Sequence, residues 1–399
     1  LNPYASHSLS RANDRVTSPT PNSYAFDIVI LGGGIAGLWL LNRLRKDGYN
    51  AILLESKTLG AKQTVASQGM VHGGIKYALG GALTGASQAI ADMPEHWRRC
   101  LRGEGDVDLR QTHVLSEYFY LWSSGGLGSK VKTFFASKAT RGRVDALKRD
   151  NYPEVFRDPA FKGNIYQLKD IVLDVPSLLQ NLKSNYQDSI YRYCWNNAEF
   201  HQTVNGTVEA LHIKNGNDAF SLTAQSFIFC AGEGNEDILN TLQIESPKMQ
   251  RRPLQQVFVK HKNHFPLYAH CMGMSTDATP RLTVSSHAAT DGDMIWYLGG
   301  DLSTEGANKD PRLLIEEAKH ELSDLFSWLD FSDATWGTYA VDRAEPKQKG
   351  LLRPDKAFVS WCDNHQNLIA AWPTKLTLAP NLADETLALL KQQNILPKA

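Results

Sequence analysis

The pattern of hydrophobic and polar positions over residues 26–55 predicts a strand, a glycine turn, a helix and a second strand. Phe26–Leu31 is a nearly continuous apolar run, typical of a parallel strand buried on both faces. Apolar residues then recur at helical spacing from Ile35 to Lys46, and an Asp-Gly pair ends the run. A second apolar run, Asn50–Leu54, leads into Glu55. These elements predict the start of a parallel α/β sheet.

The turn between the first strand and the helix has the pattern G-x-G-x-x-G, formed by Gly32, Gly34 and Gly37. The first glycine permits the sharp turn, the second lets the backbone approach a pyrophosphate, and the third lets the helix pack closely on the strand. The helix N-terminus adds free N–H groups and partial positive charge. Glu55 ends the next strand, where a carboxylate accepts the hydroxyls of an adenosine ribose. Together these features favour a dinucleotide site over an ordinary glycine turn.

Further along the chain the patterns predict a second, sheet-based unit. Residues 114–122 and 165–172 each read as one strand, and a helix is expected over 84–102. Alternating segments after residue 200 end in an apolar strand and a second glycine turn at Ala231-Gly232. Most of 241–339 alternates as strands. We expect an α/β (α+β overall) fold, in which a Rossmann-like domain accompanies a second domain on a mixed, largely antiparallel β-sheet.

The predicted division of the chain is discontinuous. Residues 1–23 are expected to be a flexible tail or a leftover expression segment, because they are polar and lack an apolar stretch. The dinucleotide-binding domain is predicted to comprise 24–98, 166–240 and 340–399, and the substrate domain 99–165 and 241–339.

Composition narrows the function classes. With 399 residues, 42% hydrophobic and 21% charged, the chain is typical of a soluble globular protein with two domains. Its formal net charge of zero gives no indication of nucleic-acid binding, and no apolar run approaches the ~20 residues that span a bilayer. The five cysteines form no C-x-x-C pair, which argues against a redox disulfide or a thiolate metal site and favours a reducing cytoplasm.

These segments, in this order, resemble the FAD-dependent oxidoreductases of the D-amino-acid oxidase type, a branch of the glutathione-reductase-like flavoproteins that includes glycine oxidase and the flavin-dependent glycerol-3-phosphate dehydrogenases. The resemblance rests on GGGIAG with Glu55, on the helix start at Asp174-Val175-Pro176, on FIFCAG and on the C-terminal strand and helix. It implies FAD as cofactor. Two stretches, HGGIKY at 72–77 and KLT at 375–377, are similar to motifs of the glycerol-3-phosphate dehydrogenases.

The resemblance also implies the site residues. The residues expected to contact FAD are Gly32, Gly34, Ile35, Ala36, Gly37, Glu55, Ser56, Ser67, Gln68, Gly69, His72, Gly73, Gly74, Ala231, Gly232, Thr374, Lys375, Leu376 and Thr377. Lys76, Tyr77, Arg343 and His72 are the expected catalytic residues. The chain departs from the family in two places, because Lys76 replaces an arginine fork with a point charge and Arg343 is only the nearest counterpart of a later arginine.

The chemistry of a flavin and of its donor determines which side chains the reaction needs. A flavin accepts a hydride at N5 and leaves negative charge at N1 and C2=O, which Lys375 and the helix that follows it are placed to stabilise. A base for an alcohol donor is expected to be His72, with His261, His264, His270 and His287 as alternatives. The histidines lack ligand spacing, so no metal is predicted.

The chain carries a single dinucleotide fingerprint and no cysteine pair, so electrons are expected to come from the organic substrate. We therefore expect oxidation of a small polar donor, such as an amino acid, a hydroxy acid or a polyol phosphate, with oxygen or a quinone as acceptor. The alternatives are an NAD(P)-dependent dehydrogenase and a flavoprotein that acts on a macromolecule. The protein is expected to be a monomer or a small homo-oligomer. We expect the basic segment 130–150 to be a solvated face; the alternative is a surface for anionic lipid or for an acidic substrate.

Overall fold

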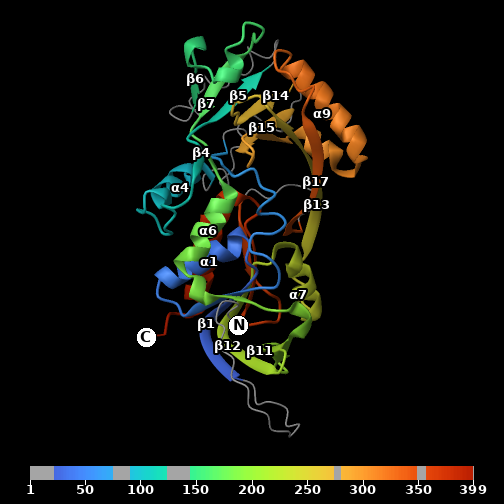
Figure 1. Ribbon diagram of the computed structural model, residues 1–399. Helices are drawn as coiled ribbons and strands as arrows, with labels where there is room; N and C mark the ends of the chain where they lie inside the picture. The colour runs from blue at the N-terminus through green and yellow to red at the C-terminus, as the bar shows by residue number, and fades with distance from the viewer. Residues whose placement is uncertain (1–21, 75–89, 124–143, 274–279, 348–355, 399) are drawn as a thin grey trace.

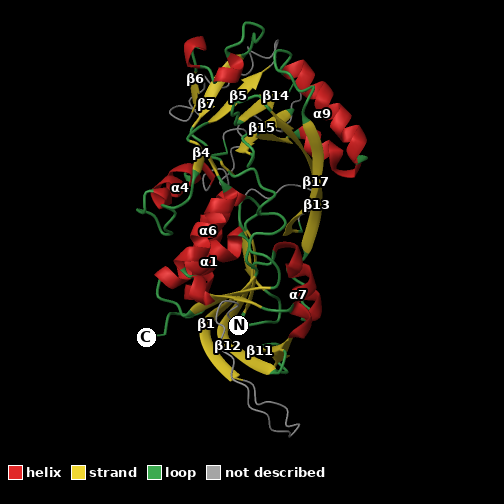
Figure 2. Cartoon of the chain, in the orientation of Figure 1, coloured by secondary structure: helices red, strands yellow, loops and turns green. Residues whose placement is uncertain are grey.

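The computed structural model describes residues 22–74, 90–123, 144–273, 280–347 and 356–398. In Figure 1 the first part of the chain and its helices lie below, and a second sheet with its own helix lies above. Figure 2 shows helices and strands interleaved along the chain, as the predicted α/β fold requires. The fold prediction is therefore confirmed. The predicted N-terminal tail lies almost wholly outside the described residues.

The first sheet contains eight of the described strands, in the order β10-β11-β12-β1-β2-β9, with β19 beside β12 and β18 beside β19. Their bounds are β1 Asn22–Leu31, β2 Ala51–Glu55, β9 Ile190–Arg192, β10 Ala198–Gln202, β11 Val208–Asn215, β12 Asp218–Phe229, β18 Phe358–Trp361 and β19 Leu368–Trp372. The centre of the sheet is parallel, because β1 pairs in parallel with β2 and β12, and β12 pairs in parallel with β19. The carboxyl ends of β1, β12 and β19 therefore meet at one edge.

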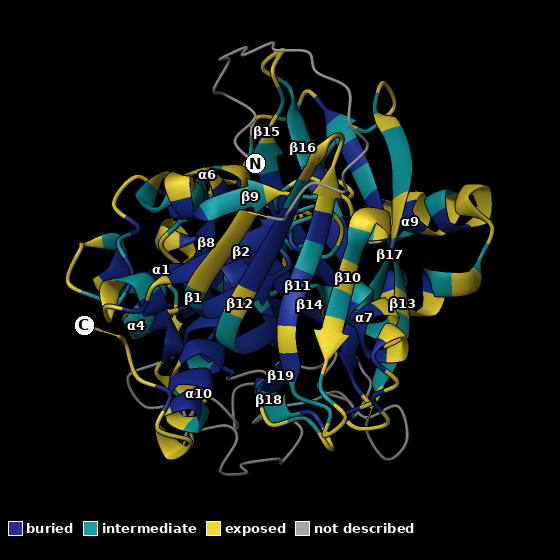
Figure 3. Ribbon diagram, turned by 90° about the horizontal axis from the view of Figure 1, so that it is seen from below, coloured by how far each residue is buried: buried dark blue, intermediate teal, exposed yellow. Residues whose placement is uncertain are grey.

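Helices cover both faces of this sheet, which is why β1 is apolar on both sides (Figure 3). Ile28 and Ile30 pack into one core with α1 (Ile35–Lys46), α4 (Met93–Leu101), α6 (Val175–Asn185) and α10 (Ala379–Gln392). Val29 and Leu31 point to the opposite face, toward α7 (Asn235–Thr241) and β11. Successive side chains of a strand alternate between faces, so a run buried on both sides needs no polar interruption.

The second sheet has the order β17-β13-β16-β15-β14-β5-β7-β6 among the described strands. Their bounds are β5 Phe119–Ser123, β6 Val144–Ala146, β7 Asn164–Leu168, β13 Met249–His261, β14 Ala269–Met272, β15 Leu282–Ala288, β16 Met294–Gly299 and β17 Thr335–Pro346. All its pairs are antiparallel except β14 with β5. One face packs on α9 (Pro311–Leu325), and the short α8 (Asp301–Glu305) follows β16.

Two segments that were predicted as single strands are each divided between two sheets. Residues 114–122 form β4 (Val114–Ser116) and β5, and residues 165–172 form β7 and β8 (Ile171–Leu173). β4 and β8 form a small third sheet with β3 (Met70–Val71). The second break is fixed by Asp170, whose Oδ1 accepts the N–H of Gly73 at 2.8 Å. Alternation along the sequence cannot show such a break, because it depends on a partner almost a hundred positions away.

The division of the chain into two domains stays a prediction. Its boundaries at 165/166 and 339/340 fall inside β7 and β17 of the second sheet. Trp97, Cys100 and Leu109 share the core that contains α1, so at least part of the segment 99–165 packs with the first sheet.

Candidate active site

A cavity of about 420 Å³ lies where the carboxyl edge of the first sheet faces the second sheet. The turns after β1, β12 and β19 contribute Gly32, Ala231 and Lys375 to its wall. Gln256 of β13 and Arg343 of β17 line it from the other side. The carboxyl edge of a parallel sheet is the usual ligand site of α/β folds, because the connecting loops converge there.

The first glycine turn is packed so tightly that side chains are excluded at two of its positions. Gly32 has a φ of +111°, and a Cβ on it would lie 2.4 Å from the Cα of Ala231. A Cβ on Gly37 would lie 1.9 Å from the carbonyl oxygen of Gly32. These two glycines therefore bring the turn against the neighbouring strand and the helix against the turn, in the roles that the pattern predicts.

The start of α1 and the end of β2 are joined through polar contacts beside this turn. Thr64 Oγ1 accepts the N–H of Ile35 at 3.1 Å. The carboxylate of Glu55 accepts the N–H groups of Gly33 and Lys57, each at 2.6 Å. Tyr193 lies close by, and burial, followed by the charge of Glu55, raises the pKa of its hydroxyl. The acid is thus held at the cavity wall by backbone donors.

The second glycine turn is held by Asn235, which the sequence analysis did not identify. Its side chain is fully buried, donates to the carbonyls of Phe229 (3.1 Å) and Ala371 (3.3 Å), and accepts the N–H of Ala231 (2.8 Å). Trp372 Nε1 donates to the carbonyl of Gly232 at 3.2 Å. Asn235 therefore connects β12, its turn and β19. An asparagine directly after the glycine turn was the available sequence signal.

The turn after β19 holds Lys375 in a buried position. Lys375 is 6% exposed, and the preceding Thr374 has a φ of +61°. Thr377 Oγ1 donates to the carbonyl of His72 at 3.2 Å, and Trp97 Nε1 donates to the carbonyl of Thr377 at 3.1 Å. The short 3₁₀ turn Leu376–Leu378 leads directly into α10.

Arg343, His270 and Thr283 are among the side chains of the second sheet that line the cavity. Arg343 lies on β17, and its charge contributes to lowering the pKa of the nearby Glu345 carboxyl against the effect of burial. His270 on β14 is 1% exposed, with its Nδ1 2.8 Å from Thr283 Oγ1 and its ring 4.5 Å from that of Phe119. Sequence analysis named His270 only as an alternative base. Its pairing with Thr283 depends on two adjacent strands and has no local signal.

Charged residues at the cavity wall form a network that crosses between the sheets. Glu233 lies 3.4 Å from Lys62 and 3.8 Å from Arg251. Arg251 also pairs with Glu236 at 2.7 Å and with Asp342 at 3.9 Å. Arg251 is thus shared among three carboxylates. Arg343 and Lys375 also line the cavity and bring two further cations to its wall.

Most of the predicted site residues come together in this cavity. Those that line it are Gly32, Gly34, Ile35, Ala36, Glu55, Ser56, Ser67, Gln68, His72, Ala231, Gly232, Arg343, Thr374, Lys375 and Leu376. The predicted residues that do not line it are Gly37, Gly69, Gly73, Gly74 and Thr377. Lys76 and Tyr77 fall outside the described residues. Wall residues that the sequence analysis did not select include Thr64, Tyr193, Gln256 and Thr283.

The donors along this cavity suit a flavin dinucleotide. A glycine turn at a helix N-terminus is built for a pyrophosphate, and an acid at the end of the next strand is built for a ribose. The model of the DAO family, described as FAD dependent oxidoreductase, matches residues 27–370. The chain belongs to this family. As a DAO-family protein it is an FAD-dependent oxidoreductase, and FAD is its cofactor.

A relative of this DAO-family chain is assigned to the same class of enzyme. A probable FAD-dependent oxidoreductase of Pseudomonas aeruginosa, PA4991, is 47% identical over 378 residues, which cover 94% of each chain. The crystal structure of that protein covers 96% of this chain and 94% of its own, with a TM-score of 0.81 and 42% identity in the structural alignment.

More distant structures share the fold. Glycine oxidase from Geobacillus kaustophilus matches with a TM-score of 0.65 at 13% identity, covering 94% of this chain and 96% of its own. An L-alpha-glycerophosphate oxidase from Mycoplasma pneumoniae, solved with FAD bound, matches with a TM-score of 0.63 at 14% identity, covering 92% and 95%.

Three further findings concern the described helices, the cysteines and the basic segment. In the described part of the chain, no helix has both the length and the apolar character needed to cross a bilayer. None of the five cysteines forms a disulfide. Part of the basic segment is used internally, because Arg149 donates to the carbonyls of Phe161 (3.1 Å) and Asp158 (2.8 Å). Residues 130–143 of that segment lie outside the described ranges.

Proposed function

We propose that this oxidoreductase removes a hydride from a small polar donor that carries a carboxylate or a phosphate, such as an amino acid, a hydroxy acid or a polyol phosphate. The observation that carries the proposal is that Arg343 and Lys375, from different sheets, line the same cavity as the glycine turn. When bound, FAD supplies the hydride acceptor, N5 of its ring, and passes the electrons to oxygen or a quinone.

The two cations have separate tasks in this proposal. Arg343 offers a planar fork of donors, which suits a carboxylate or phosphate better than a single ammonium does. With FAD bound, Lys375 and the N–H groups at the start of the following helix would stabilise negative charge on the reduced ring. Both side chains are shielded from bulk water, so each charge interacts more strongly than it would at the surface.

A donor with a hydroxyl group must also lose a proton. His270 is our preferred base, because Thr283 fixes the orientation of its ring in the cavity wall. His72, the base expected from the sequence, lines the same cavity and is the alternative. The donor must lie about 3 to 3.5 Å from the ring for hydride transfer, and Arg343 would set that position through the anionic group.

Because the cofactor is FAD, the chain is not the NAD(P)-dependent dehydrogenase that the sequence analysis kept as an alternative. A macromolecular donor remains the competing proposal. We propose a cytoplasmic location, because none of the cysteines forms a disulfide, and we leave monomer and small homo-oligomer open.

The test is an anaerobic bleaching screen of the flavin with amino acids, 2-hydroxy acids and phosphorylated polyols. We expect one of these classes to reduce the flavin, and Arg343→Gln to weaken that donor by about 10- to 100-fold with FAD still bound. Arg343→Lys should recover part of the loss. Arg251→Gln is the matched control, because it removes another arginine from the cavity wall, one whose guanidinium lies 2.7 Å from Glu236. Failure of every small donor, or an unchanged affinity in Arg343→Gln, contradicts the proposal.

A further inference from the structure

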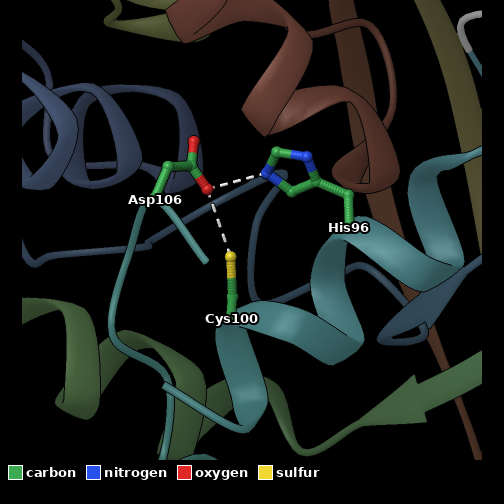
Figure 4. Close-up of side chains that lie close together, drawn as sticks. All are labelled: His96, Cys100 and Asp106. Carbon is green, nitrogen blue, oxygen red and sulfur yellow. Dashed lines mark hydrogen bonds and ion pairs between the residues drawn. The ribbon is translucent and has the colours of Figure 1, made fainter. Parts of the chain in front are cut away.

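A cluster of three ligand-type side chains lies outside the cavity, on α4 and the loop that follows it. His96 and Cys100 are four residues apart and therefore share one face of the helix, and Asp106 returns to them from the loop (Figure 4). Their ligand atoms all lie within 4.8 Å of one another. None of the three lines the cavity that holds the candidate active site.

The loop is shaped to bring Asp106 onto the helix. The N–H groups of Gly103 and Leu109 both donate to the carbonyl of Cys100, each at 3.0 Å, which folds the loop back on the end of α4. Gly105 is required at the closest approach, because a Cβ there would lie 2.4 Å from the sulfur of Cys100. The position of Asp106 is therefore set by the backbone and does not depend on an ion.

We propose that His96 Nε2, Cys100 Sγ and Asp106 Oδ1 form a binding site for Zn²⁺, with water as the fourth ligand. One imidazole, one thiolate and one carboxylate are all donors that Zn²⁺ accepts, and a mixed soft and hard set disfavours Mg²⁺ and Ca²⁺. Side chains of His96 and Asp106 are 16% and 15% exposed, so water reaches the site, while Cys100 is fully buried.

Binding requires the ligand atoms to shift relative to one another by up to about 1 Å. Without an ion, Asp106 Oδ1 lies 2.7 Å from His96 Nε2 and 3.2 Å from Cys100 Sγ, and all three ligand atoms lie within 4.8 Å of one another. Tetrahedral zinc with bonds of about 2.0 to 2.3 Å places its ligand atoms about 3.3 to 3.7 Å apart. His96 and Asp106 must therefore separate by about 0.6 Å, and His96 and Cys100 must approach each other by up to about 1.1 Å. On binding, the thiol loses its proton to the buffer, neutral His96 donates a lone pair and Asp106 binds as the carboxylate, so charge and protons balance.

Charges around the cluster favour a cation despite the nearby arginine. Arg43 donates to the other oxygen of Asp106 at 2.8 Å, leaving Oδ1 for a metal. The same guanidinium also pairs with Asp47 at 3.2 Å and Asp384 at 2.9 Å. Arg43 thus faces three carboxylates. A ligating carboxylate whose second oxygen is hydrogen-bonded is the usual outer-shell arrangement of zinc sites.

The site would brace the wall of the active-site cavity from behind. Trp97, next to His96 on α4, donates to the carbonyl of Thr377 in the segment that follows Lys375. Zinc would fix α4 to its return loop and, through Asp106 and Arg43, to α1 and α10. The sequence analysis predicted no metal. It considered the histidines and the cysteines separately and therefore did not use the His96–Cys100 spacing.

The test uses the FAD-loaded protein after removal of metal with a chelator. Addition of Co²⁺ should give a near-ultraviolet thiolate-to-cobalt charge-transfer band in the difference spectrum, saturating at one equivalent and abolished by Zn²⁺. Cys100→Ser should lose the band, and His96→Ala should weaken zinc binding by about a hundredfold or more. Flavin content and circular dichroism report whether each variant is folded.

Cys194→Ser is the matched control, because Cys194 is exposed and lies in the loop after β9, away from α4, and it should keep the band. His212→Ala controls for the pair His201 and His212, whose rings lie 3.8 Å apart. A wild-type protein that gives no thiolate band overturns the proposal without reference to any variant. So does a band that survives in Cys100→Ser or disappears in Cys194→Ser, or zinc affinity that depends on His212.

Discussion

Gly37→Ala tests whether the helix of the dinucleotide turn really rests on the turn itself. Alanine is the better helix former by about 1 kcal/mol, so in an unobstructed helix the substitution stabilises. Here the new Cβ would lie 1.9 Å from the carbonyl oxygen of Gly32 and 3.3 Å from Leu53 Cδ1. The geometry and the intrinsic propensity therefore predict opposite signs.

The magnitude follows from how far α1 must move. Real Cβ atoms essentially never approach another atom within 3.0 Å, so the shortfall from 1.9 Å is about 1.1 Å. A shift of that size strains the bond from Asn42 Nδ2 to the carbonyl of Leu182 at 2.9 Å and the pairing of Arg43 with Asp384. Overpacking costs up to about 3 kcal/mol, and with the gain in propensity subtracted we expect a net loss of about 2 kcal/mol.

The assay is urea unfolding of the FAD-free protein followed by circular dichroism, which keeps flavin binding out of the stability. Flavin affinity is then measured separately and should fall in Gly37→Ala. Gly34→Ala is the control, because its backbone is extended and its Cβ would meet only Thr64 Oγ1, at 3.2 Å. That variant should stay within about 0.5 kcal/mol of wild type. A Gly37→Ala protein that is more stable than wild type would refute the reasoning.

Three further predictions concern ionisable groups. Burial opposes ionisation of Glu345, but hydrogen bonds from Arg252 at 2.9 and 3.0 Å outweigh it and its pKa is lowered. The stability gained is complete above the unfolded pKa of about 4.3 and is lost as pH falls below it, so Glu345→Gln should cost about 3 kcal/mol at pH 7 and flatten the acid limb of a pH–stability curve. Burial lowers the pKa of His261 to about 4, so folded protein excludes a proton that unfolded chain binds. Stability should therefore decline as pH falls from about 6.5 toward 4, and His261→Leu should remove that slope in the same urea titrations. Burial also raises the pKa of Cys230 to about 12, whereas Cys194 is exposed, so a thiol reagent at pH 8 should label Cys194 rapidly and Cys230 only after unfolding. Rapid loss of both thiols in folded protein would contradict the assigned burial.

Local sequence was sufficient for the elements whose geometry is determined by neighbouring residues. β1, the turn at Gly32, α1 and β2 were predictable because apolar spacing and glycine positions specify strand, turn and helix without help from distant segments. The start of α6 could also be predicted from the local sequence, because Asp174 Oδ2 accepts the N–H of Ser177 at 2.8 Å within the same turn.

The interruptions at residues 117–118 and 169–170 could not be read in this way. The strands on either side of each interruption join different sheets, and the choice depends on which distant edge offers a partner. Apolar residues stand on either side of each break, so the local pattern joins the two parts into one strand.

By itself the sequence determined the dinucleotide fingerprint and the order of strands and helices around it, because those depend on contacts over a few residues. The tertiary structure decided which side chains meet at the cavity wall: Thr64 at the start of α1, Asn235 between β12 and β19, and His270 on Thr283. These contacts join segments from 13 to more than a hundred residues apart, and no local spacing encodes a contact that exists only once distant segments have packed together.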